Sequence, residues 1–229
     1  MAAASSLRAP LTELARRFEE THPGSRVALS FGASSWLAVQ IRAGAPVDVF
    51  LSADARQVAA LSDLGLLLSD RSYDFASNRL VVVVSRRADF QLETQGDLAR
   101  PELRRFALPP SVVPLGHYGR AWLQERGLLA ALQGRTVQST DARATLAAVE
   151  LGQADAALVY ATDAALSDRV RVAFRVPESE QPSILYVAAL TPRGARHPAA
   201  EAFLRFLRDP GATLLEAAGF LPSPSEARP

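Results

Sequence analysis

The sequence contains no cysteine, and this absence excludes several kinds of chemistry at once. A chain without thiols cannot form disulfides, use a thiolate nucleophile or bind a metal through cysteine ligands. Lysine is absent as well, so all 25 basic residues are arginines, and no long basic run stands out among them. A nucleic-acid backbone requires a concentrated basic surface, often with aromatic side chains between the charges. We therefore expect no nucleic-acid partner.

Long apolar runs are also missing. The longest, "RLVVVVS" at residues 79–85, is far shorter than the ~20 residues that span a bilayer, and it is typical of a buried strand. The first residues, "MAAASSL", have neither the basic segment nor the full apolar segment of a signal peptide. These absences predict a soluble protein that is either cytosolic or has lost its leader.

What the sequence does contain is ordinary for a globular protein. Of its 229 residues, 48% are hydrophobic and 21% are charged, and the formal net charge is +1. This length suits either one large domain or two lobes, each able to bury a core of its own.

The first part of the chain alternates between helix and strand patterns. Leu11, Leu14, Ala15 and Phe18 recur at helical spacing before the stop signal "THPG". The patterns that follow predict a strand at 25–31, a helix at 34–44, a strand at 47–53, a helix at 55–65 and a buried strand at 78–85. Such alternation is typical of a doubly wound α/β fold, in which helices cover a parallel sheet.

The second part of the chain has a similar set of elements. The patterns predict strands at 104–111, 135–140, 156–160 and 169–176, helices at 118–129 and 141–153, a further strand at 183–191, two closing helices at 197–220 and a frayed tail at 221–229. We therefore predict an α/β fold of two lobes, each a doubly wound, mostly parallel sheet flanked by helices. Lobe I is expected to comprise residues 1–80 and 188–229, and lobe II residues 81–187. Two extended hinge crossings are expected near Val81–Ser85 and Leu185–Ala189.

Several predicted helices begin with small, uncharged, hydroxyl-rich turns, where open α/β sheets bind ligands. The first turn of a helix has backbone N–H groups without partners and carries roughly +0.5 of an elementary charge, so it can bind an anion without a cation. The pattern predicts an oxyanion site made of neutral donors. The turns concerned are Ser5–Ser6, Ala33–Ser35, 112–118, Thr140–Ala142 and Tyr160–Thr162.

A simpler interpretation is that each of these Ser and Thr residues only caps its own helix, which contributes about 1 kcal/mol. The oxyanion interpretation requires several turns to share one face. Such a site would favour fully deprotonated tetrahedral ions over monohydrogen phosphate, because a ligand hydroxyl would find no acceptor. Sulfate, molybdate and tungstate would then be distinguished by the size of the cavity.

The segments "AAASSL", "FGASSWLAVQIRAGAPVDVFLSAD", "VVPLGHYGRAWLQ" and "DARATLAAVELGQADAALVYATDA" resemble, in order and spacing, the molybdate-binding periplasmic proteins of molybdate ABC transporters. The resemblance covers nearly the whole chain. It implies a two-lobed periplasmic binding-protein fold without enzymatic activity or cofactor. It also implies a monomer outside the cytoplasm that captures molybdate or tungstate between its lobes and delivers it to a membrane permease.

The resemblance also implies the residues that bind the ion. They are the Ser6 and Ser34 hydroxyls, the Leu115 and Ala142 amides and the Tyr160 hydroxyl, with Ser5 and Ser35 as additional candidates.

Two features depart from the family pattern. Pro109–Pro110 stands where relatives often carry Asp-Pro, and only Met1–Ala4 precede the first serines, where relatives usually have a short strand. We expect this first strand to be missing, with the natural start upstream or trimmed away.

Two other functions are compatible with the residues. The chain could bind another tetrahedral oxyanion, such as sulfate. Ser34, His117 and Asp163 could in principle form the triad of a serine hydrolase, although the sequence has no Gly-x-Ser-x-Gly elbow.

The remaining polar and aromatic candidates are expected to be structural. A metal would need its acidic ligands to converge, but each Asp near a strand end is expected to cap a turn or helix, or to hold Arg143. We expect His22 and His197 at the surface, and Trp36 either in the core or at the rim of the site. The acidic residues concerned are Asp48, Asp54, Asp141 and Asp163.

Overall fold

The computed structural model describes residues 1–223 and divides the chain into two compact units. Unit 1 contains Met1–Ser77 and the segment from Ile184 onward, and unit 2 is Asn78–Ser183. The chain therefore passes from one unit to the other after Ser77 and after Ser183. Two crossings were predicted and two are found, but each lies a few residues earlier than expected, because Val81–Ser85 and Leu185–Ala189 are strands inside sheets.

Unit 1 is built on a five-stranded sheet with the order β2-β1-β3-β10-β4. β1 is parallel to both β2 and β3, whereas β10 is antiparallel to both β3 and β4. The sheet is therefore mixed, with its parallel half at one side. The strands are β1 (Ala2–Ala4), β2 (Ser30–Gly32), β3 (Val49–Ser52), β4 (Tyr73–Ser77) and β10 (Leu185–Leu190).

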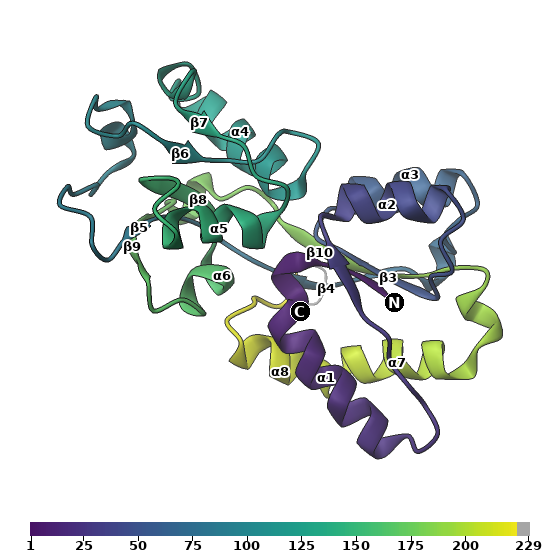
Figure 1. The fold of residues 1–229 in the computed structure, drawn as a ribbon. Coiled ribbons are helices and arrows are strands. Elements are labelled where there is room, and N and C mark those ends of the chain that lie inside the picture. The colour runs from purple at the N-terminus through teal and green to yellow at the C-terminus, as the bar shows by residue number, and fades with distance from the viewer. Residues whose placement is uncertain (224–229) are drawn as a thin grey trace. The chain divides into compact units, whose positions relative to one another are not determined.

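The strand that we expected to be missing is formed by the first alanines themselves. Ala2 pairs with Ser30 on one side and with Phe50 on the other, so β1 lies between β2 and β3. All three alanines of β1 are buried. Small side chains suit this position because helices pack on both faces of the sheet (Figure 1).

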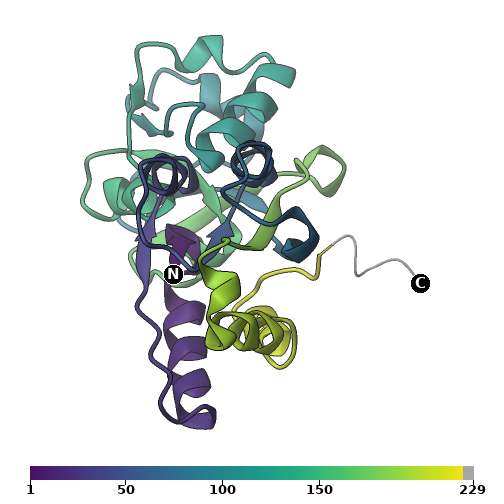
Figure 2. The same ribbon diagram turned by 90° about the vertical axis from the view of Figure 1, so that its right-hand side faces the viewer.

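Helices cover the two faces of this sheet. α2 and α3 lie on one face, and α1, α7 and α8 lie on the other (Figures 1 and 2). The break predicted in the closing helices is confirmed, since the Asp209–Pro210 peptide separates α7 from α8. The helices of unit 1 are α1 (Arg8–Thr21), α2 (Ser34–Arg42), α3 (Ala55–Asp63), α7 (Pro198–Arg208) and α8 (Gly211–Ala217), with short 3-10 turns η1 (Ser5–Leu7), η2 (Ser69–Arg71) and η6 (Gly194–Arg196).

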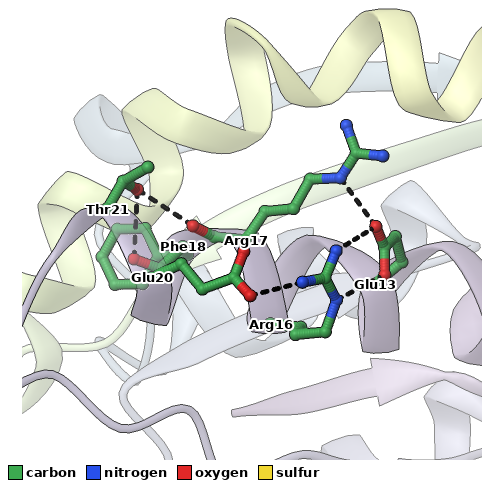
Figure 3. A network of polar contacts seen from close by, with 6 residues as sticks. All are labelled: Glu13, Arg16, Arg17, Phe18, Glu20 and Thr21. Atoms are coloured by element: carbon green, nitrogen blue, oxygen red, sulfur yellow. Dashed lines mark hydrogen bonds and ion pairs between the residues drawn. The ribbon is translucent and has the colours of Figure 1, made fainter.

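α1 shows how the sequence divides a helix into two faces. Its larger apolar residues, including Leu14 and Phe18, are buried. On the exposed face the Glu13 carboxylate accepts hydrogen bonds from Arg16 and Arg17, and Arg16 also bonds Glu20 (Figure 3). These bonds lower the pKa of Glu13 to about 2.

Unit 2 is built on a second five-stranded sheet, with the order β7-β6-β8-β5-β9. β6 is parallel to both β7 and β8, and β5 is antiparallel to both β8 and β9. This sheet is also mixed. The strands are β5 (Leu80–Ser85), β6 (Phe106–Ala107), β7 (Thr136–Val137), β8 (Ala156–Tyr160) and β9 (Val170–Arg175); the helices are α4 (Pro114–Glu125), α5 (Ala142–Glu150) and α6 (Ala161–Ala165), with 3-10 turns η3 (Gln95–Ala99), η4 (Ala130–Leu132) and η5 (Glu178–Glu180).

The continuous valine run of β5 is explained by burial on both faces of the sheet. Val81 and Val83 belong to a core cluster that also contains Leu146 and Val149 of α5. Val82 and Val84 point to the opposite face, because side chains alternate along a strand, and they are buried as well.

Several local predictions were wrong. The strand predicted at 25–31 is confined to Ser30–Gly32, and the Val27 N–H instead donates to the Glu19 carboxylate. β4 had not been predicted. Of the two alternatives for Trp36, the core position is excluded because the residue is 62% exposed, and a position at the rim of the site stays a prediction. Part of the predicted frayed tail is ordered, since Leu221 pairs with Ser77, while residues 224–229 lie outside the described residues.

Candidate functional site

The carboxyl ends of three neighbouring parallel strands form the candidate site in unit 1. Because β2, β1 and β3 are adjacent and parallel, the segments that follow them lie at the same edge of the sheet. η1 follows β1 and α2 follows β2. The structure thus brings four predicted hydroxyls to one edge, and all four residues are buried: Ser5, Ser6, Ser34 and Ser35, which we call the unit 1 donor group.

Ser34 begins α2 and is fixed by the segment after β3. Its Oγ accepts a hydrogen bond from the Ala53 N–H at 3.0 Å. Ser52 Oγ, in turn, accepts from the Asp54 N–H at 3.1 Å and donates to the Asp54 carbonyl at 2.8 Å. This arrangement holds the Ser34 oxygen in place, and the Ser34 proton is still able to serve another acceptor.

Ser6 is held by a residue far away in the sequence. Its Oγ lies 2.9 Å from the Tyr186 Oη, and both residues are buried. Tyr186 belongs to β10, which comes from the last part of unit 1. No local pattern links "SILYVAALT" to "AAASSL", so this partner was not predicted from the sequence.

The candidate site in unit 2 has the same design. β7, β6 and β8 are adjacent and parallel, so their carboxyl ends also share one edge of the sheet. α4 comes after β6, α5 after β7 and α6 after β8. The three predicted donors of this edge are buried: Leu115, Ala142 and Tyr160, which we call the unit 2 donor group.

Leu115 is the second residue of α4, where a backbone N–H has no acceptor in its own helix. The preceding Val113 has no side chain that could cap the helix. Among residues 1–223, the Leu115 N–H has no hydrogen-bond partner. A buried amide of this kind can serve an anion, and the dipole of a twelve-residue helix favours negative charge there.

The loop before α4 is fixed by close packing. A Cβ on Gly116 would lie 2.2 Å from the Pro110 carbonyl oxygen and 2.5 Å from that of Pro109, so only glycine fits. Arg120 Nε also donates to the Pro109 carbonyl at 3.0 Å. The Pro-Pro departure from the family pattern therefore has a defined conformation. Gly116 belongs to the predicted turn at 112–118, but its packing role was not predicted.

Ala142 begins α5 and presents its backbone N–H beside a capping carboxylate. Asp141 Oδ1 accepts from the Ala144 N–H at 3.0 Å, which confirms the predicted cap. Asp54 caps α3 in the same way through the Arg56 N–H.

An ion pair connects the turns of α5 and α6. Arg143 Nη1 lies 3.6 Å from Asp163 Oδ1, and the Asp163 side chain is completely buried, so the prediction that Asp163 holds Arg143 is confirmed. Burial raises the pKa of Asp163 to about 7, against the opposing effect of Arg143. The Arg143 guanidinium therefore lies next to a carboxyl group, beside Ala142.

Tyr160 is the last residue of β8 and the N-cap of α6. It pairs with Leu80 in the sheet, and its ring is almost completely buried. The aromatic ring therefore has little freedom, and the phenol is held at the same edge as Leu115 and Ala142.

The other polar candidates do not form a metal or catalytic centre. Asp48 bonds Arg193 at 2.9 Å, and His197 is exposed. His22 stacks on Phe18 at 4.0 Å between ring centroids and is partly buried. Within residues 1–223, no three acidic, histidine or cysteine side chains gather into a group that could hold a metal ion.

Comparison with known proteins matches nearly the whole chain to one family. Residues 1–221 match the family described as bacterial extracellular solute-binding protein. The chain belongs to this family. Members of the family bind solutes and are not enzymes, which excludes the serine-hydrolase alternative. No helix in residues 1–223 is both long and apolar enough to cross a bilayer.

Individual members of this solute-binding family support the same assignment. The molybdate-binding protein ModA of Mycobacterium tuberculosis is 33% identical over 220 residues, covering 95% of this chain and 82% of the relative. ModA of Escherichia coli is 32% identical over 215 residues, covering 92% and 83%. The periplasmic molybdate-binding protein of Azotobacter vinelandii has a similar structure, with a TM-score of 0.85 and 26% identity over 96% of this chain and 97% of that one. The two-lobed α/β fold agrees with this similarity.

Proposed function

We propose that this protein captures molybdate, or the similar ion tungstate, outside the cytoplasm and delivers it to the permease of an ABC transporter. The observation that carries the proposal is the chemistry of the two donor groups. Each consists of buried, uncharged hydrogen-bond donors at the carboxyl edge of parallel strands. Relatives that are named as molybdate-binding proteins, at about one-third identity, support the choice of ion.

Neutral donors can hold a doubly charged ion if there are enough of them. A hydrogen bond to a charged partner contributes about 1.5–3 kcal/mol, so several bonds offset the cost of removing a small dianion from water. Helix N-termini add a favourable field. In the proposal, Ser6 and Ser34 contribute hydroxyls, Leu115 and Ala142 contribute amides, and Tyr160 contributes its phenol, with Ser5 and Ser35 as further candidates.

In this proposal, the donors named above serve the ion, which favours the form of the protein in which it has the most contacts. The permease then recognises the loaded protein. The proposed ligand is the oxyanion itself, and molybdenum enters without any protein ligand to the metal.

Equilibrium dialysis against molybdate, followed by elemental analysis of the protein, tests this function. We expect one molybdenum per chain after removal of free ion, and its loss when excess tungstate is added. A tenfold excess of sulfate should displace little of it. A protein that retains no molybdenum, or that exchanges it equally well for sulfate, would contradict the proposal.

A further inference from the structure

We propose that Tyr186 is a positioning residue for the oxyanion site: its hydroxyl donates to Ser6 Oγ and thereby leaves the Ser6 proton for the ligand. The inference rests on the proposed function, since it assigns a role to a residue that acts through Ser6. It adds a residue of β10 to a site otherwise built from turns after parallel strands.

The geometry places Tyr186 firmly against Ser6. The two oxygens are 2.9 Å apart and buried. The Tyr186 ring packs edge-on against Phe75 at 6.2 Å and against Phe220 at 5.3 Å between centroids. Contacts with two rings, together with burial, restrict the Tyr186 side chain and hold its hydroxyl beside Ser6.

The direction of the bond follows from the chemistry of the two hydroxyls. A phenol, with a pKa near 10, is a stronger donor than the aliphatic hydroxyl of serine. Within residues 1–223, Tyr186 is the sole hydrogen-bond partner of Ser6 Oγ. If the phenol donates, one lone pair of the Ser6 oxygen is used and the Ser6 proton is directed elsewhere.

Ser34 provides an independent parallel. Its Oγ accepts from the Ala53 N–H, a group that can only donate. The two proposed serine ligands would thus each receive one hydrogen bond from the protein and give one to the ion. Each serine oxygen then has one lone pair left instead of two, so a ligand hydroxyl has fewer acceptor sites at the serines, which disfavours monohydrogen phosphate relative to molybdate.

The inference predicts a change in selectivity when the phenol is removed. Tyr186→Phe keeps the ring, so its packing against Phe75 and Phe220 is preserved. We expect about a three- to tenfold loss of molybdate affinity, the range of one neutral hydrogen bond. The affinity for monohydrogen phosphate should fall less, because the freed Ser6 oxygen can accept a hydrogen bond from the phosphate hydroxyl. Tyr186→Met also removes the hydroxyl, and it should reduce the difference in affinity between molybdate and monohydrogen phosphate in the same way.

The experiment is a double-mutant cycle by calorimetry at pH 8, with molybdate and phosphate as titrants. Wild type, Tyr186→Phe, Ser6→Ala and the double variant are compared, and thermal unfolding verifies that each is folded. Tyr73→Phe is the matched control, because it removes a hydroxyl of unit 1 that donates to the Leu204 carbonyl. In the Ser6→Ala background, loss of the Tyr186 hydroxyl should change molybdate affinity by less than about twofold.

The outcomes separate this inference from the proposed function. Suppose that wild type binds molybdate. The role of Tyr186 alone would be overturned if the two substitutions had additive effects on molybdate affinity, or if Tyr186→Phe lowered the affinity for both ions equally. Unchanged molybdate affinity in both Tyr186→Phe and Tyr186→Met would do the same. Wild type that binds no molybdate would overturn the proposed function, and the inference with it.

Discussion

The Ser34 hydroxyl oxygen accepts a hydrogen bond from the backbone N–H of Ala53, and the two atoms are 3.0 Å apart. Both residues are buried. The bond joins the first turn of α2 to the segment after β3, so one side chain both connects two elements and retains a proton to donate. This combination distinguishes Ser34 from a serine that only caps its helix, and indeed Ser34 is inside the helix and Ala33 occupies the N-cap.

Ser34→Ala is expected to lower molybdate affinity by at least tenfold, since it removes a bond to a charged ligand. It should also lower the free energy of unfolding by about 1–3 kcal/mol, because the Ala53 N–H loses its buried acceptor. Calorimetry and denaturant unfolding measure the two effects. Ser30→Ala, at an exposed position of β2, is the control. Molybdate affinity equal to that of wild type would remove Ser34 from the site.

Tyr160→Phe is expected to weaken molybdate binding by about three- to tenfold, because the phenol no longer donates to the ion. Tyr118→Phe makes the same chemical change within unit 2, in α4, and should leave affinity close to wild type. The comparison requires only two titrations. If the two variants lose affinity equally, the Tyr160 hydroxyl has no special role.

Gly116→Ala tests the packing that positions the Leu115 amide. The new Cβ would approach the Pro110 carbonyl oxygen to 2.2 Å, so the loop or the helix must move. Crowding of this kind costs about 1–3 kcal/mol of stability, more than the roughly 1 kcal/mol that alanine gains over glycine in a helix. We expect lower stability together with weaker molybdate binding.

The control for this variant is Gly96→Ala, where a Cβ would make only an ordinary contact with Thr94 at 3.7 Å. The stability and the molybdate affinity of Gly96→Ala should both stay near the wild-type values. Full molybdate affinity in a destabilised Gly116→Ala protein would show that the position of the Leu115 amide is unimportant for binding.

Asp163→Asn tests the buried ion pair through the pH dependence of stability. Burial raises the pKa of Asp163 from 3.8 to about 7, so the folded protein keeps this proton after the unfolded chain has lost it. The unfolding free energy should therefore fall as pH rises from about 4 to about 7, and this contribution is constant above that range. Asparagine does not titrate, so the variant should gain stability relative to wild type across the same interval.

Denaturant unfolding at several pH values measures this difference. Asp63→Asn, on the exposed end of α3, controls for the loss of one acidic group. If the wild-type protein shows no such fall between pH 4 and 7, and instead loses stability relative to Asp163→Asn as pH drops below about 4, then Arg143 outweighs burial and the pKa of Asp163 is lowered.

Local patterns predicted the elements that carry their own signals. The apolar spacing of Leu14 and Phe18 identified α1, and the order of strands and helices indicated two α/β sets. Asp54 and Asp141 were recognised as caps because a carboxylate before a helix bonds its first turn. These features depend on residues close together in the chain.

Features that depend on residues far apart in the sequence could not be predicted from local patterns. β4 and β10 pair antiparallel across more than a hundred residues, and the parallel pattern of the early strands gave no indication of it. The same applies to Tyr186, whose role depends on Ser6 at the other end of unit 1. Ala2–Ala4 were too few and too small to predict a central strand. The position of each predicted donor within its own unit is known only from the structure.

A calorimetric titration of the purified protein with molybdate, tungstate, sulfate and phosphate at one pH and ionic strength tests the central claim most directly. The account predicts one site per chain, with molybdate and tungstate bound more tightly than sulfate, and with monohydrogen phosphate bound weakest. Tighter binding of sulfate than of molybdate, or no heat with any of the four ions, would contradict it.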